Sequence, residues 1–79
     1  MKKKIKLIWD FYGPDASKTA EHHEIHLKEY IEKHALSLQI TGVEQTGEVQ
    51  FSAFMVVDET EMIAVRDALL PHRGTLYEA

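Results

Sequence analysis

The stretch that decides the fold is Asp15 to Leu36, DASKTAEHHEIHLKEYIEKHAL. Apolar residues and histidines recur along it every three or four positions, which is the period of an amphipathic helix lying on a protein core. That stripe comprises Ala16, Ala20, His23, Leu27, Tyr30, Ile31 and His34. The same stretch holds four of the five histidines of the chain. It is therefore both the main predicted structural element and the main source of reactive side chains.

The segments on both sides of this helix alternate between apolar and polar residues, as strands with one buried face do. Before the helix, Ile5 to Phe11 alternate, and Gly13-Pro14-Asp15 ends the strand because glycine and proline interrupt regular structure. After the helix we expect a second strand over 36–41, a turn at 44–47 in which Gly47 supplies a positive φ, and a third strand over 48–57.

A second, shorter helix is predicted after the third strand. Asp58 and Glu61 have the spacing of a capping box, in which Asp58 accepts from the first helical amides and Glu61 reaches back. The apolar face of this helix carries Met62, Val65 and Leu69 together with Arg66, and the helix ends before Pro71. We expect Arg73-Gly74 to turn the chain and Thr75 to Tyr77 to form a short edge strand.

The predicted order is β-α-β-β-α-β within a single domain covering residues 1–79. This order is typical of the α+β ferredoxin-like sandwich, with two helices on one face of a four-stranded antiparallel sheet. The other face would expose the apolar residues Ile8, Tyr12, Phe54 and Val56. Such a surface predicts a homodimer that meets through its sheets, or a bound ligand. In the alternative, Lys4, Lys6, Gln50 and Ser52 make this face polar enough for a monomer.

Composition excludes several classes of protein. A chain of 79 residues without cysteine has a small core and neither disulfides nor thiolate metal sites, which fits a reducing cytoplasm. From Gly13 onward there are five basic and twelve acidic residues, a balance of 5 − 12 = −7, so nucleic-acid binding is disfavoured. No segment approaches the ~18 apolar residues of a membrane span, and the lysine-rich start lacks the other features of a signal peptide. We therefore expect a cytoplasmic protein.

The run from His23 to Leu27, preceded by a strand and the Gly-Pro-Asp turn, resembles the His-x-x-His-Leu pattern of YCII-related proteins. These proteins belong to the dimeric α/β-barrel superfamily, and the resemblance covers about residues 4–36. It implies a sheet-to-sheet dimer of ferredoxin-like protomers with a pocket near the first helix. It also implies a histidine and an aspartate as catalytic groups, which here would be His26 or His23 with Asp10.

The residues themselves allow the same acid–base chemistry. A neutral histidine near an aspartate can act as a general base, and His26 lies at the border of the helical stripe. The alternative is a packed histidine hydrogen-bonded within the core. Aromatic residues that could line a ligand site near it are Trp9, Tyr12, Tyr30 and Phe54, although aromatics at strand spacing are more often core or dimer contacts.

Metal binding is a further possibility. His22 and His26 are four residues apart on a helix, so both imidazoles project to one side and could share a divalent ion such as zinc. A third ligand would have to come from Asp10, Glu29 or His72. No other cofactor is expected. Our leading hypothesis is a homodimeric small-molecule-binding, accessory or regulatory module; the alternatives are a YCII-like enzyme and a metal-binding protein.

Overall fold

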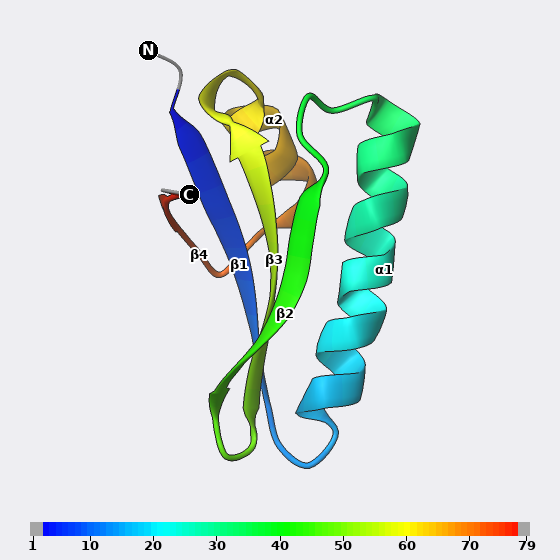
Figure 1. The fold of residues 1–79 in the computed structure, drawn as a ribbon, viewed down its shortest axis with the longest axis vertical. Helices are drawn as coiled ribbons and strands as arrows, with labels where there is room; N and C mark the ends of the chain where they lie inside the picture. The colour runs from blue at the N-terminus through cyan, green and yellow to red at the C-terminus, as the bar shows by residue number, and fades with distance from the viewer. Residues whose placement is uncertain (1–2, 78–79) are drawn as a thin grey trace.

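The computed structural model describes residues 3–77 as one sheet with two helices (Figure 1). The elements are β1 (Lys4–Tyr12), α1 (Ala16–His34), β2 (Ile40–Gly47), β3 (Gln50–Asp58), α2 (Glu59–Leu69) and β4 (Arg73–Leu76). The four strands form one antiparallel sheet in the order β2-β3-β1-β4. The predicted βαββαβ ferredoxin-like fold is confirmed.

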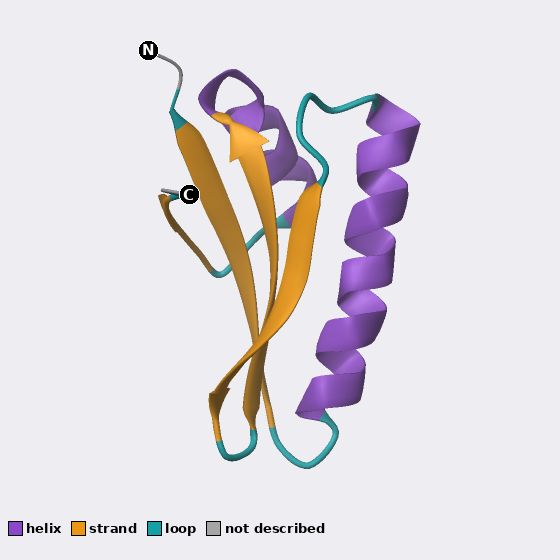
Figure 2. Cartoon of the chain, viewed as in Figure 1, coloured by secondary structure: helices purple, strands orange, loops and turns teal. Residues whose placement is uncertain are grey.

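Both helices pack on the same face of the sheet. The core on that face joins Leu7 and Trp9 of β1 and Met55 and Val57 of β3 to buried residues of the helices, which include Ala20, Leu27, Ile31 and Val65. The stripe predicted for α1 is confirmed in part, since Ala16, Ala20, Leu27 and Ile31 are buried. Figure 2 shows α1 running along nearly the whole length of the sheet, whereas α2 covers only the end where β1 begins.

The second strand and its hairpin lie further along the chain than predicted. The strand begins at Ile40 rather than at Leu36, and the turn is Glu48-Val49 rather than 44–47. Helix α1 ends at Ala35 in the left-handed conformation (φ 50°), and the Leu36 N–H donates to the Ile31 carbonyl. The prediction that Leu36 begins a strand is therefore wrong, because Leu36 packs on the core just after the end of the helix.

The start of α2 and the last strand also differ from the prediction. Asp58 accepts from the Thr60 N–H at 3.0 Å, as expected of an N-cap. The Glu61 carboxylate does not close a capping box; it accepts from the Ser37 N–H at 3.3 Å and ties α2 to the segment before β2. Strand β4 includes Arg73 and Gly74, which were predicted to form a turn, because they pair with Ile8 and Leu7 of β1.

The face of the sheet without helices is covered by its own charged side chains. Lys6 lies over the Phe54 ring, with Nζ 4.4 Å from the centroid, and binds Glu44 at 2.6 Å. The Phe54 ring lies on Gly42, where a Cβ would come within 2.6 Å of it. Beneath these groups Ile8 and Val56 are 5% and 0% exposed. Lys6 and Glu44 thus make part of this face polar, whereas Ser52, which the monomer alternative also invoked, is 1% exposed.

This face therefore exposes fewer apolar residues to a partner chain than the sequence predicts. Of the four apolar residues predicted to be bare there, Ile8 and Val56 are buried within one chain and Phe54 is half-buried, while Tyr12 is 70% exposed. The homodimer stays a prediction. Between residues 3 and 77, neither helix is long and apolar enough to cross a membrane.

Candidate functional site

A groove lies between the first turns of α1 and the last part of β1. It has a volume of about 340 Å³ and is lined by Phe11, Lys18, Thr19, His22, His23 and His26. The five helical residues share one side of α1 because they are three or four positions apart. Phe11 is accessible because α2 ends at Leu69, whose carbonyl accepts from the Trp9 indole N–H at 2.9 Å. The Phe11 ring contacts the rings of both His23 and His72.

His23 forms part of the aromatic floor of this groove. Its ring centroid is 4.9 Å from that of Trp9 and 5.6 Å from that of Phe11. Its Nε2 atom is buried and has no hydrogen-bond partner within residues 3–77. Burial lowers the pKa of His23 below its ordinary value of 6.5, and the nearby His26 and His72 lower it further. The imidazole is therefore neutral near pH 7, with one nitrogen able to donate or accept a hydrogen bond.

His22 and His26 form the outer wall of the groove. Their rings are stacked, with centroids 4.8 Å apart and planes 18° from parallel. His26 is 63% exposed, and its Nδ1 atom lies 3.3 Å from the Glu29 carboxylate. In the part of the chain that the structure describes, no group of three or more metal-ligating side chains is placed to hold an ion. The predicted pair of metal ligands therefore lies together, but the third ligand does not join it.

Asp10 lies on the opposite face of the sheet from the groove. Its neighbours Trp9 and Phe11 contact His23, so the alternation of the strand directs Asp10 to the face without helices. There its carboxylate binds Arg73 at 3.1 Å and accepts from the Ser52 hydroxyl at 2.6 Å. The Arg73 hydrogen bond, together with that from Ser52, lowers the pKa of Asp10 despite its burial. The structure does not bring Asp10 to either of the predicted catalytic histidines.

The four aromatic residues predicted to line one ligand site lie in separate places. Trp9 is 3% exposed and belongs to the core. Tyr30 stacks on His34 near the end of α1, with ring centroids 4.1 Å apart. Phe54 and Tyr12 lie on the face without helices, Phe54 beneath Lys6 and Tyr12 at the end of β1. Of these four residues, Trp9 is the one with a ring contact to a histidine of the groove, His23.

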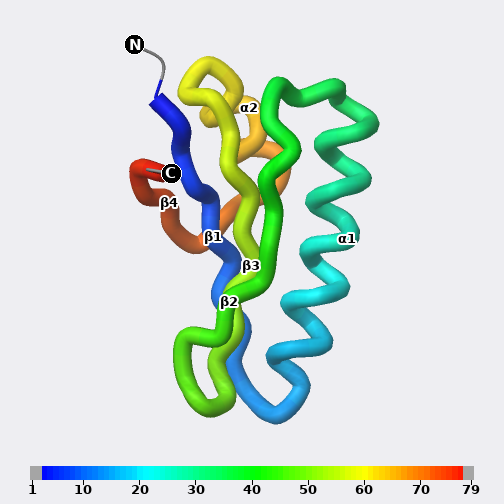
Figure 3. The backbone as a smooth tube through the Cα atoms, viewed as in Figure 1, coloured from blue at the N-terminus to red at the C-terminus, as the bar shows by residue number. Residues whose placement is uncertain are grey.

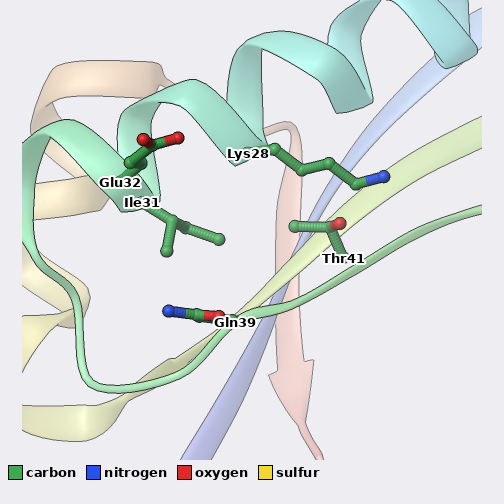
Figure 4. Close-up of a pocket in the computed structure, with 5 residues that line it drawn as sticks. All are labelled: Lys28, Ile31, Glu32, Gln39 and Thr41. Carbon is green, nitrogen blue, oxygen red and sulfur yellow. The ribbon is translucent and has the colours of Figure 1, made fainter.

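A second groove of about 400 Å³ lies further along α1, between that helix and the segment that enters β2 (Figure 4). Its lining residues are Lys28, Ile31, Glu32, Gln39 and Thr41. Charges of both signs border it, since Lys28 and Glu32 come from successive turns. Lys28 lies 3.8 Å from Glu24, which also accepts from the Thr41 hydroxyl at 2.9 Å. Of the polar residues in this groove, Lys28 and Thr41 already contact Glu24, and Ile31 at its floor is 4% exposed.

Sequence reasoning missed several residues around the histidine groove. Lys18 and Thr19 are one turn before His22 and His23, so their helical spacing could have placed them in the lining. His72, considered above only as a possible third metal ligand, is exposed but makes two contacts beside the groove. Its Nδ1 atom accepts from the Asp10 backbone N–H at 2.8 Å, and its ring contacts Phe11. That contact depends on the pairing of β4 with β1, which no local pattern specifies.

Comparisons of the chain with protein-family models, with curated proteins and with solved structures gave no match. The resemblance to YCII-related proteins therefore stays a prediction.

Proposed function

We propose that this protein is a small-molecule-binding module and that its ligand occupies the histidine groove between α1 and β1. The observation that carries the proposal is the state of His23. A buried polar nitrogen without a partner costs about 1–3 kcal/mol, and such a group in a native protein calls for an explanation. His23 is packed on Trp9 and Phe11 at the floor of a groove, where a ligand could supply the missing hydrogen bond after a small movement of the ring.

The size and construction of the groove support this use. Its volume of about 340 Å³ falls within the range of small-molecule sites, which are commonly ~300–1,000 Å³. Most of its lining comes from one helix, and that helix is fixed on the core by the buried residues Ala16, Ala20 and Leu27. A site on a packed helix keeps its shape without a ligand, which favours binding.

The experiment is an NMR titration of the ¹⁵N-labelled full chain with a mixed set of acidic, basic and neutral aromatic compounds. We expect at least one compound to shift the backbone amides of Phe11 and of residues 18–26. A Thr19→Trp variant should abolish these shifts, because Thr19 is an exposed lining residue and an indole at that position would fill the groove.

The matched control is Gln39→Trp, which places the same side chain in the second groove. This variant should leave the shifts in residues 18–26 unchanged. If no compound shifts those amides, or if Gln39→Trp removes the shifts as completely as Thr19→Trp does, the proposed site is wrong.

We further propose that the module is a homodimer in the cytoplasm, as the sequence suggests. Its support is the small core expected of 79 residues and the exposed Tyr12 on the face without helices. Light scattering with and without EDTA tests the dimer. A mass near twice 9.1 kDa that ignores the chelator supports it, and a monomer contradicts it. A dimer that dissociates in EDTA would instead favour the metal alternative at His22 and His26.

The enzyme alternative is less well supported than binding. It needs a histidine and Asp10 at one site. The carboxylate of Asp10 instead binds Arg73 and Ser52 on the face of the sheet opposite the groove. An Asp10→Asn variant that still binds the groove compounds with unchanged affinity would agree with the binding module.

A further inference from the structure

We propose that the ligand of the histidine groove is a small organic anion with a planar apolar body, of the aromatic carboxylate type. This inference rests on the proposed function and adds the chemical class of the ligand.

The net charge of the groove lining is opposite in sign to the net charge of the whole molecule. The chain has 13 acidic and 9 basic residues, yet the six residues of the lining comprise one lysine, three histidines and no carboxylate. Lys18 forms no ion pair with any residue in 3–77, so its ammonium is available to a ligand. Glu29, which contacts His26 from the following turn, is 67% exposed and does not belong to the lining. A negative ligand would therefore meet one unpaired ammonium group, three imidazoles and no carboxylate in the lining, although the protein as a whole is acidic.

The floor of the groove favours a flat apolar group. Phe11 and His23 present rings that meet at 60°, and the Trp9 ring lies behind His23 at 54°. Aromatic rings of a ligand can pack edge-to-face or offset on such a surface. A carboxylate on the ligand would then lie toward Lys18 and the exposed imidazoles. Inorganic anions would make only the second of these contacts.

The second groove lacks this combination. Glu32 lines it beside Lys28, and Lys28 is already close to Glu24. Among the lining side chains that Figure 4 labels there is no aromatic ring. The two grooves have similar volumes, about 340 and 400 Å³, so a preference of an aromatic anion for the first would arise from chemistry and not from size.

The test uses three compounds of nearly equal shape: benzoate, benzamide and benzylamine. Each is titrated into the ¹⁵N-labelled full chain at neutral pH, with acetate as a fourth compound that has the charge without the ring. We expect all shifts to map to Phe11 and residues 18–26. Benzoate should bind about fivefold more tightly than benzamide, the value of one partly exposed ion pair, and more tightly than acetate and benzylamine.

Two matched lysine variants assign the charge. Lys18→Gln should lower the affinity for benzoate to about that for benzamide and leave benzamide unchanged, since only the ion pair is removed. Lys28→Gln, in the second groove, should change neither affinity.

The outcomes separate this inference from the proposed function. The anion class is overturned if benzoate and benzamide bind equally well, or if Lys18→Gln leaves the benzoate affinity unchanged. In either case, shifts in residues 18–26 would still support the proposed site. Acetate binding as tightly as benzoate overturns the aromatic part. Absence of shifts in residues 18–26 with every compound overturns the proposed site itself.

Discussion

The two faces of the sheet are closed by different means. On the helix face, Leu7 and Met55 are 2% and 0% exposed beneath the apolar residues of α1 and α2. On the other face, Ile8 and Val56 are equally buried, at 5% and 0%, but ion pairs and the Phe54 ring belong to their cover. Long charged side chains can cover apolar surface with their stems while their charges remain in water. Equal burial therefore does not imply equal contributions to stability.

The largest expected effect is on the helix face. Leu27→Ala removes a side chain that is 1% exposed between α1 and the sheet, and it should lower the free energy of unfolding by about 3 kcal/mol through lost burial and the cavity left behind. Urea denaturation followed by circular dichroism measures the change. Ile25→Ala, on the exposed side of the same helix, is the control and should change the stability by less than about 0.5 kcal/mol.

A smaller loss is expected on the other face. Arg73→Gln removes the guanidinium group that pairs with Asp10, a side chain that is only 11% exposed. In the variant, Asp10 keeps the hydrogen bond from the Ser52 hydroxyl. Because Arg73 is 51% exposed and solvent screens the pair, we expect a loss of about 1 kcal/mol. Arg66→Gln breaks a pair in which both side chains are more than half exposed, and should have almost no effect. Equal effects of the two variants would contradict a supporting role for the Asp10–Arg73 pair.

The packing of Phe54 on Gly42 allows a second test of how the face without helices contributes to stability. A methyl group at Gly42 would lie 2.6 Å from the ring, so Gly42→Ala should displace Phe54 and open the cover over Val56. We expect a loss of up to about 1 kcal/mol, because the ring can move outward. A Gly42→Ala, Phe54→Ala double variant, measured by the same urea denaturation, should show a non-additive loss. Strict additivity would indicate that the two positions act independently.

The smallest expected effects are on the pH dependence of stability, which should differ between the two faces of the sheet. His23 has a lowered pKa in the folded state, so the unfolded chain binds the proton more readily and stability should decrease as the pH falls below 6.5. Asp10 also has a lowered pKa, so its contribution is fully present above 3.8 and is lost as the pH falls through the folded value. Thermal unfolding across this pH range should therefore show two separate decreases.

Single variants assign these decreases to the faces. His23→Leu should remove the decrease that begins near pH 6.5, and Asp10→Asn should remove the one in stronger acid. His34→Gln, at the exposed end of α1, serves as the control and should retain both. Persistence of the first decrease in His23→Leu would assign it to another histidine.

The sequence predicts the helix face better than the other face, for a physical reason. Apolar periodicity placed Leu27 and Ile31 on the core correctly, because it reports directly on burial. The pairs that cover the other face depend on strand register, which brings Lys6 to Glu44 and Asp10 to Arg73 from distant parts of the chain. The same limit applied to the candidate site. Helical spacing alone identifies His22, His23 and His26 as neighbours. Asp10 lies between Trp9 and Phe11 in the strand, and strict alternation would have placed it on the opposite face from them.

His72 has a consequence for the behaviour of the protein at high concentration. Strand β4 pairs with β1 only from Ile5 to Ile8, so it lies beside just the first part of that strand (Figure 3). The backbone N–H of Asp10 would otherwise be an open edge, and open edges invite strands of other molecules. Instead it donates to the His72 imidazole, and the backbone N–H of His72 donates to the Ile8 carbonyl. His72 thus extends the ladder by one residue, and we expect this to oppose edge-to-edge aggregation at that part of β1.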